Sequence, residues 1–330
     1  MNIIVALVGV LILVLIAYIG AGVAGLYNLF GVYIPYVAFV IFVIGIVYRV
    51  IKWACSPVPF RIPTSCGQQK SLEWIKDSKL ENPAGLIGVL GRMALEVFLF
   101  RSLFRNTKAE LKDNRLIYSG DKWLWGAGLL FHYSFLVIIL RHFRFFTEPV
   151  APFVKILQDL DGFFELNIPV FYLSDAAILV AVTYLFLRRV VIPQVKYISL
   201  PADYFPLLLI LGIVGSGVLM RHFYKVDLVG VKELVMGLIT FHPTLPEGIG
   251  AIFYLHFFLV CSLVAYFPFS KLLHMPGIFM SPTRNLANNN RMVRHINPWN
   301  PQVKVHTYEE WEEEFHDLLK GAEIPLDKEL

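Results

Sequence analysis

The sequence predicts an all-α integral membrane protein, in which a bundle of six membrane-spanning helices is followed by a polar C-terminal tail. Hydrophobic residues make up 57% of the chain and charged residues only 16%. Six largely uncharged runs approach the roughly 20 residues that cross about 30 Å of hydrocarbon as an α-helix. They cover residues 3–23, 33–53, 123–143, 168–187, 204–223 and 249–269.

The first span has two interpretations. Small residues at positions 21–24 are compatible with a cleaved secretory signal. However, the segment lacks a basic n-region, and its apolar run is longer than a signal needs. We therefore expect residues 1–30 to form an extra N-terminal transmembrane helix; cleavage would leave five spans.

The distribution of basic residues predicts the orientation of the spans. Between Lys52 and Lys122, the loop carries ten further basic residues: Arg61, Lys70, Lys76, Lys79, Arg92, Arg101, Arg105, Lys108, Lys112 and Arg115. By the positive-inside rule this loop is cytoplasmic, as are Arg188 and Lys196 and the C-terminal tail. Both termini then lie on the cytoplasmic side of the cell membrane. Within the loop, the apolar but charged stretch 83–104 predicts a helix that lies in the interface or packs on a partner.

Four histidines in or beside two of the spans are the main chemical signal. His132 and His142 lie in the third span, and His256 and His274 lie in and just after the last one. An imidazole in hydrocarbon is costly and is retained where it coordinates or relays something. Because the two spans run antiparallel, His142 faces His256 near the outside and His132 faces His274 towards the cytoplasm. Two such pairs predict the axial ligands of two haems b.

The spacing of these histidines requires a distortion of the last helix. His132 and His142 lie about 15 Å apart along their helix axis, whereas His256 and His274 lie about 27 Å apart along theirs. We expect Pro268 to bend the helix and bring His274 back beneath the bundle. Small residues nearby either make room for a macrocycle or allow close helix packing, and the sequence leaves both open. They are Gly126, Gly128, Gly212, Gly215 and Gly217.

The cysteines and the polar tail carry separate information. Cys55, Cys66 and Cys261 form no C-x-x-C-H motif and no cluster, so we expect free thiols. In the tail, residues 281–330, Thr307 and Glu310 predict a capping box. It starts a helix with an apolar stripe of Trp311, Phe315 and Leu318. Docking on a cytoplasmic partner and packing on the chain's own loops are the two interpretations of that stripe.

Several stretches carry a family resemblance. They are LLFHYSFLVIILRHF (129–143), RRVVIPQV (188–195), ITFHP (239–243) and IFYLHFFLVCSLVAYFPFSKLLH (252–274). They resemble the gamma, cytochrome b subunit of respiratory nitrate reductases, and the similarity predicts a gamma-like domain at residues 31–280. The segments LGRMALEVFLFRSLFRN (90–106) and WNPQVKVHTYEEWEEEF (299–315) resemble a narrower branch. That branch is the cytochrome b (M) subunit of the Dsr complex, also called the Hdr-like menaquinol oxidoreductase.

The resemblance implies a dihaem cytochrome b that oxidises menaquinol and passes electrons to a cytoplasmic Hdr-like iron–sulfur subunit. Its setting is an anaerobic respiratory complex of sulfur or sulfate metabolism, whose activity is shared with partner subunits. These include a second integral membrane subunit, a multihaem cytochrome c and a further iron–sulfur subunit. By the resemblance, His142 and His256 match the outer haem ligands, and His132 and His274 match the inner ones.

The quinol site does not follow the family pattern. The family associates a lysine in an outer loop with quinol binding, and the corresponding position here is near Tyr172. The candidates for the site are instead Arg141, Lys155 and His242. Glu148 and His222 are further polar residues predicted at the outer face.

Other functions remain as alternatives. The chain could belong to the gamma-type cytochromes b of another respiratory reductase. In a different class, it could be a transporter with a histidine proton relay, although Asp175 is the main carboxylate within a span. A haem-free membrane anchor is the third alternative. The sequence contains no evident nucleophile, phosphate-binding loop or nucleic-acid surface.

Overall fold

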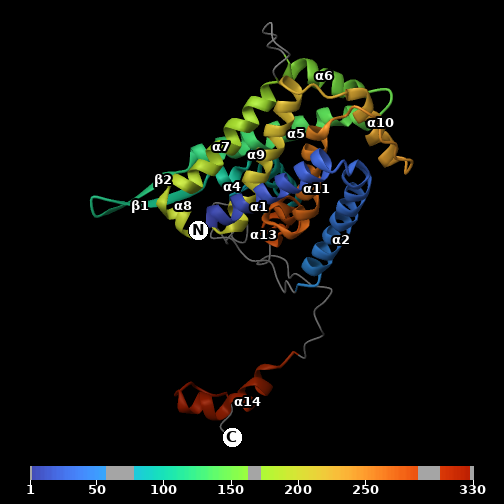
Figure 1. Ribbon diagram of the computed structural model, residues 1–330. Coiled ribbons are helices and arrows are strands. Elements are labelled where there is room, and N and C mark those ends of the chain that lie inside the picture. Colours follow the sequence, from blue (N-terminus) through green and yellow to red (C-terminus); the bar gives the residue numbers. More distant parts are fainter. Residues whose placement is uncertain (1, 57–77, 163–171, 289–304, 328–330) are drawn as a thin grey trace.

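The computed structural model describes residues 2–56, 78–162, 172–288 and 305–327. Figure 1 shows a bundle of long helices, a hairpin that projects from its side, and one C-terminal helix away from it. The long helices are α1 (Asn2–Ala17), α2 (Ile34–Ala54), α5 (Lys122–His142), α7 (Leu173–Val191), α9 (Pro201–His222) and α11 (Ala251–Tyr266).

Short turns of other helix types lengthen four of these helices. Five of the resulting helical segments are long and apolar enough to cross a membrane: Asn2–Val23, Leu29–Ala54, Lys122–Phe145, Pro201–His222 and Ala251–Phe269. They match the predicted spans to within a few residues at most of their ends. The chain is therefore a membrane protein, as predicted.

The remaining predicted span, residues 168–187, corresponds to α7. The described helix begins at Leu173, because residues 168–171 lie outside the described part. Its 19 residues include three charged ones, Asp175, Arg188 and Arg189. It packs between α5 and α9. The count of six spans stays a prediction.

Hydrogen bonds and ion pairs define two ends of the bundle. At one end, Asn2 donates to the Ser199 carbonyl (2.9 Å), and Arg188 pairs with Asp121 (2.8 Å). We call this the proximal end, because the chain starts there. At the other, distal end, Arg141 at the close of α5 pairs with Asp175 at the start of α7. Helix α7 therefore runs antiparallel along the whole of α5.

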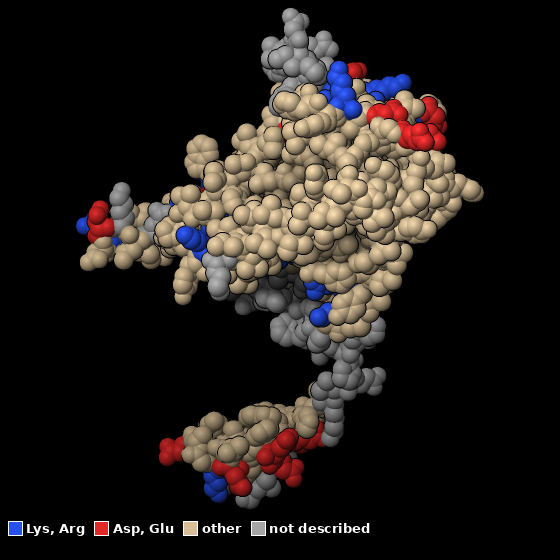
Figure 2. All heavy atoms as spheres, viewed as in Figure 1, with Lys and Arg blue, Asp and Glu red and all other residues tan. Residues whose placement is uncertain are grey.

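Two shorter helices cover the distal end (Figure 1). They are α6 (Pro152–Asp161) and α10 (Leu228–Ile239). Asp227 caps α10 by accepting from the backbone N–H groups of Val229 and Gly230, as N-cap aspartates do. Figure 2 shows charged side chains gathered towards the ends of the molecule and a broad uncharged band between them on that face. Such a band suits contact with acyl chains.

The long basic loop is structured where it is described. It forms α3 (Leu86–Leu99), α4 (Arg101–Phe104) and an antiparallel hairpin of β1 (Thr107–Lys112) and β2 (Arg115–Gly120). The described chain is mostly helical, as predicted, and this hairpin is an exception. Its strands are only six residues long, and only β1 alternates charged with small or apolar side chains, whereas β2 does not. The turn at Asp113 and Asn114, with φ of 50° and 60°, was a second available signal.

Short helices and the tail complete the chain. They are α8 (Pro193–Ile198), α12 (His274–Phe279), α13 (Pro282–Asn285) and α14 (Tyr308–Gly321). The predicted capping box of α14 is confirmed. The Thr307 hydroxyl accepts from the Glu310 N–H (3.2 Å), and the Glu310 carboxylate accepts from the Thr307 N–H (3.1 Å).

Candidate haem-binding site

The structure brings His132 and His274 together. The two imidazole rings lie edge-on with their centroids 5.8 Å apart and an interplanar angle of 86°. Metal–imidazole bonds are about 2 Å long, so two axial imidazoles on one iron have centroids about 6 Å apart. This pair therefore has the separation that two axial ligands require.

The chain reaches this position by a break in the last span. Helix α11 ends at Tyr266, and Pro268 lies in a single 3₁₀ turn, Phe267–Phe269. Ser270 then takes an extended conformation, and its hydroxyl caps the next turn by accepting from the Leu272 N–H (3.1 Å). The expected bend at Pro268 is therefore a termination followed by a new turn. Proline has no N–H to continue the hydrogen-bond ladder and its ring clashes with the carbonyl four residues earlier, so the regular helix ends before it.

His142 and His256 form the second pair, at the distal end. His142 is the last residue of α5, and His256 lies near the start of α11. The two imidazoles are close enough to interact electrostatically. Along α5 this pair lies about 15 Å from the first.

All four imidazoles are oriented in the same way, through their Nδ1 atoms. Each Nδ1 lies within hydrogen-bonding distance of a backbone carbonyl: Gly128 for His132 (2.7 Å), Ile138 for His142 (2.7 Å), Lys271 for His274 (3.0 Å) and Ile213 for His256 (3.0 Å). A carbonyl only accepts, so Nδ1 carries the proton and Nε2 carries the lone pair. This is the arrangement of metal-ligating histidines.

Ser216 is a site residue that the sequence analysis missed. Its hydroxyl lies 2.9 Å from His256 Nδ1 and 2.9 Å from the Ile213 carbonyl. The partners of His256 thus come from α9, whereas each of the other three histidines bonds to its own neighbourhood in the chain. A contact between two helices leaves no signal in a single sequence.

Glycines beside the histidines test whether a macrocycle has room. A Cβ atom at Gly126 or Gly215 would meet nothing within 4 Å. At Gly217 a Cβ would come within 3.4 Å of the His256 ring, and at Gly212 within 3.5 Å of Leu259. Open space therefore lies next to two of the five predicted glycines, while the others serve close contacts. The ligand type at both pairs and the ligand separation at His132 and His274 fit haem.

A buried polar cluster lies next to His142. Arg141 is 8% exposed and lies between two carboxylates, with Nε 3.1 Å from Asp161 and Nη2 2.7 Å from Asp175. The ring of Tyr172 is sandwiched between the guanidinium groups of Arg141 (3.6 Å) and Arg221 (3.9 Å). Because Asp175 pairs with Arg141, an ion pair accounts for this carboxylate, and a proton relay is not needed to explain it.

The predicted quinol-site residues all lie at the distal end, but they differ in accessibility. Arg141 is buried in the cluster described above. Lys155 on α6 is exposed, and so is His242 after α10, whose Nδ1 lies 2.8 Å from the Thr240 carbonyl. Glu148 pairs with Lys232, and His222 is half-buried at the end of α9. Among the described residues, no bond joins Arg141, Lys155 and His242 to one another.

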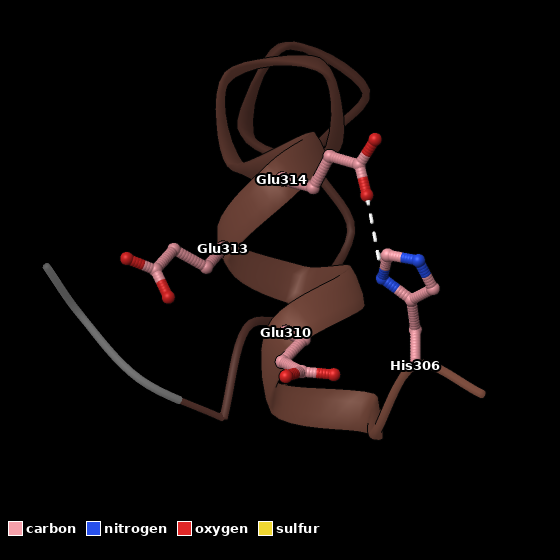
Figure 3. A pocket seen from close by; sticks show the side chains of 4 residues that line it. All are labelled: His306, Glu310, Glu313 and Glu314. Carbon is pink, nitrogen blue, oxygen red and sulfur yellow. Dashed lines mark ion pairs between the residues drawn. The ribbon is translucent and has the colours of Figure 1, made fainter. Parts of the chain in front are cut away.

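A shallow pocket on the tail is separate from the histidine pairs. It is lined by His306, Glu310, Glu313 and Glu314 (Figure 3). His306 Nδ1 lies 3.7 Å from a Glu314 carboxylate oxygen. Among the described residues no group of three or more His, Cys, Asp or Glu side chains could hold a bare metal ion. Cys55 and Cys261 are free thiols as predicted, and Cys66 lies outside the described residues.

Comparison with known proteins places the chain in a family. Residues 87–296, which include all four histidines, match the family model described as nitrate reductase gamma subunit. The chain belongs to the nitrate reductase gamma subunit family. This confirms the resemblance noted in the sequence.

Two relatives of this gamma-family chain are proteins named Hdr-like menaquinol oxidoreductase cytochrome b-like subunit. The one from Archaeoglobus fulgidus is 48% identical over 264 residues, which cover 78% of this chain and 79% of the relative. The one from Archaeoglobus profundus is 42% identical over 268 residues, which cover 79% and 80% of the two chains. Both names describe a cytochrome b-like subunit of a quinol oxidoreductase.

Proposed function

We propose that this gamma-family chain is a dihaem cytochrome b that oxidises menaquinol and passes the electrons to a cytoplasmic Hdr-like iron–sulfur subunit. The observation that carries the proposal is the common orientation of four histidines, each with Nδ1 held on a carbonyl and with Nε2 left as a ligand. The names of the two relatives support the same reading.

The histidines would hold the two haems as two pairs. His132 and His274 would be the axial ligands nearer the proximal end, and His142 and His256 those nearer the distal end. Each Nδ1–carbonyl bond fixes a ring and raises its basicity as a ligand. Haem iron, when bound, accepts and donates one electron at a time, and ligand basicity and burial set its potential.

The orientation in the membrane follows from charge. We propose six spans: α1, α2, α5, α7, α9 and α11. Successive helices of this set run alternately from the proximal to the distal end and back. In α7, 19 helical residues measure about 28 Å, close to the thickness of the hydrocarbon. Arg188 and Arg189 make the proximal end basic, so we assign it to the cytoplasm together with both termini.

Quinol would be oxidised at the distal, outer face. Oxidation of a quinol removes two electrons and two protons, and at this face the protons leave to the outside. Both Lys155 and His242 are exposed there. The Lys155 ammonium can donate to an oxygen of a quinol headgroup, and His242, whose Nδ1 lies on the Thr240 carbonyl, has an Nε2 lone pair that can accept from a quinol hydroxyl. Arg141 remains the third candidate, because it lies next to His142 and its pairing holds the outer end of α5.

The proposed partners follow from the family resemblance and from the tail. We propose a cytoplasmic Hdr-like iron–sulfur subunit, a second membrane subunit, a multihaem cytochrome c and a further iron–sulfur subunit, working with the menaquinone pool in sulfur or sulfate respiration. In this scheme residues 31–280 form the dihaem domain, residues 1–30 an added helix, and residues 281–330 the docking tail. On α14, Trp311, Phe315 and Leu318 are 41%, 37% and 71% exposed, so the apolar stripe is available.

A reduced-minus-oxidised spectrum with haem quantification tests the proposal. We expect two haems b per chain in the purified membrane protein, both reduced when a menaquinol analogue is added. A colourless preparation would favour a haem-free anchor. Two haems that quinol does not reduce would point to another respiratory partner.

A further inference from the structure

Helix α3 has the reverse of the polarity expected for a helix in water. Its buried positions include Arg92 and Glu96, at 0% and 5% exposure. Its outward face carries only apolar side chains within an arc of about 120°. They are Leu86, Ile87, Leu90, Ala94 and Phe98, of which Ile87 is 88% and Phe98 61% exposed.

The chain itself supplies hydrogen-bond and ion-pair partners for the buried charged side chains of α3. Arg92 donates to the backbone carbonyls of Glu81, Arg284 and Leu286. Glu96 pairs with Arg284 at 3.3 Å. Since these groups have partners within the chain, the polar face of α3 needs no water and no other subunit.

The C-terminal end of α3 lies against the proximal half of α5. Tyr133 donates its hydroxyl to the Phe98 carbonyl (2.9 Å), and Trp125 donates its indole N–H to the Leu99 carbonyl (2.7 Å). The last carbonyls of a helix lack partners within the helix, and in hydrocarbon the protein must supply them. Tyr133 lies about 16 Å along α5 from Lys122, well inside a segment that is long and apolar enough to span the membrane.

The chain reverses direction at this deep point. Phe100 takes a left-handed conformation (φ 49°, ψ 48°), which is unfavourable for a bulky residue, and its ring lies edge-on to His132 with centroids 4.9 Å apart. Helix α4 then returns towards the start of α5, where the Phe104 carbonyl accepts from the Lys122 ammonium (2.6 Å). Arg101, which directly follows Phe100, and Arg105, which follows α4, both pair with Glu81.

We propose that α3 and α4 form a re-entrant segment, which enters the bilayer from the proximal side and lays its apolar face against acyl chains. Three observations identify lipid as the occupant. The outward face of α3 carries no charge, it is continuous with the lipid-facing side of α5, and the last carbonyls of α3 are capped by side chains of that span. The segment covers the proximal half of α5 next to His132. This inference rests on the membrane spans and does not require haem.

Spin labels in the purified full-length complex, reconstituted in liposomes, test this proposal. In a background without Cys55, Cys66 and Cys261, a label is placed at Ile87→Cys or Phe98→Cys. Collision with oxygen, which concentrates in lipid, is compared with collision with a water-soluble nickel complex. Ile44→Cys on α2 (63% exposed) is the lipid reference, and Leu111→Cys on the hairpin (73% exposed) is the water reference.

We expect both labels on α3 to match Ile44 and to differ from Leu111. Nickel accessibility like that at Leu111 would overturn the proposal by placing the helix in water. Protection from both reagents would also overturn it, because a protein partner would then cover the face. Two label sites keep the test decisive if one variant fails to assemble.

Discussion

His132 and His274 lie with their ring centroids 5.8 Å apart, although one lies in the middle of α5 and the other follows the end of α11. The contact joins two antiparallel segments, and it lies nearer the proximal end than the second histidine pair does. His142 and His256 join the same two segments at the distal end. Each proposed haem therefore depends on one residue from each segment, and the two haems depend on different residues.

The haems should accordingly be lost one at a time. Replacing His132 or His274 with alanine should leave one haem per chain, the outer one, still reducible by quinol. Replacing His142 or His256 should leave only the inner haem and abolish its reduction by quinol. For haem content alone, His242→Ala is the control, because His242 has the same Nδ1–carbonyl bond but no partner imidazole among the described residues. Two haems per chain in all four variants would refute the ligand assignment.

Ser216→Ala should raise the midpoint potential of the outer haem alone. Loss of the hydroxyl at His256 Nδ1 removes an acceptor, which weakens the imidazole as an electron donor to iron. A redox titration that resolves the two haems measures the shift. Ser262→Ala is the matched control, because that hydroxyl donates to the Phe258 carbonyl of its own helix (2.8 Å). An equal shift of both haems would mean that Ser216 acts on the bundle as a whole.

Arg141→Ala should destabilise the distal end by about 3–5 kcal/mol, because it leaves two buried carboxylates without their cation. Release of the outer haem on heating in detergent measures the effect. Arg144→Ala, which removes a bond to neutral Gln158 (3.1 Å), should cost less. Combining Arg141→Met with Asp161→Asn and Asp175→Asn should recover part of the loss. If Arg141→Ala left stability unchanged, the ion pairs would contribute nothing measurable.

Lys155→Ala and His242→Ala should slow the reduction of the haems by quinol while leaving both haems bound. Both side chains are exposed at the distal end, and neither contributes to the buried cluster. Stopped-flow reduction by a menaquinol analogue measures the rate. Lys196→Ala on α8, at the proximal end, is the control and should leave it unchanged. An inhibitor that altered only the spectrum of the inner haem would place the quinol site at the wrong end.

Truncation after Pro301 should release the cytoplasmic iron–sulfur partner and leave both haems assembled and reducible. Helix α14 lies away from the bundle in Figure 1, and its stripe of Trp311, Phe315 and Leu318 is exposed. In the full chain, Trp311→Ala should weaken docking by about 2 kcal/mol or more, as buried aromatic anchors do. Glu313→Gln is the control in the same helix. Undiminished copurification of the partner with the truncated chain would contradict a docking role.

The sequence by itself determined the features that depend on neighbouring residues. The lengths of the apolar runs defined five helices that can span a membrane and the helix that became α7, because a span is set by local composition. Thr307 and Glu310 predicted the start of α14, because a capping box is a contact over three residues. The pairing of His132 with His274 also followed, since antiparallel spans leave few alternatives.

The tertiary structure decided what depends on contacts between distant segments. Ser216 reaches His256 only because α9 and α11 pack together, and Arg141 meets Asp161 only because α6 folds back on α5. The inverted polarity of α3 is likewise invisible in composition, which records that Arg92 and Glu96 are charged but not that they face inward. Hydrophobicity along the chain selects the helices, whereas the partner of each buried polar group is selected by packing.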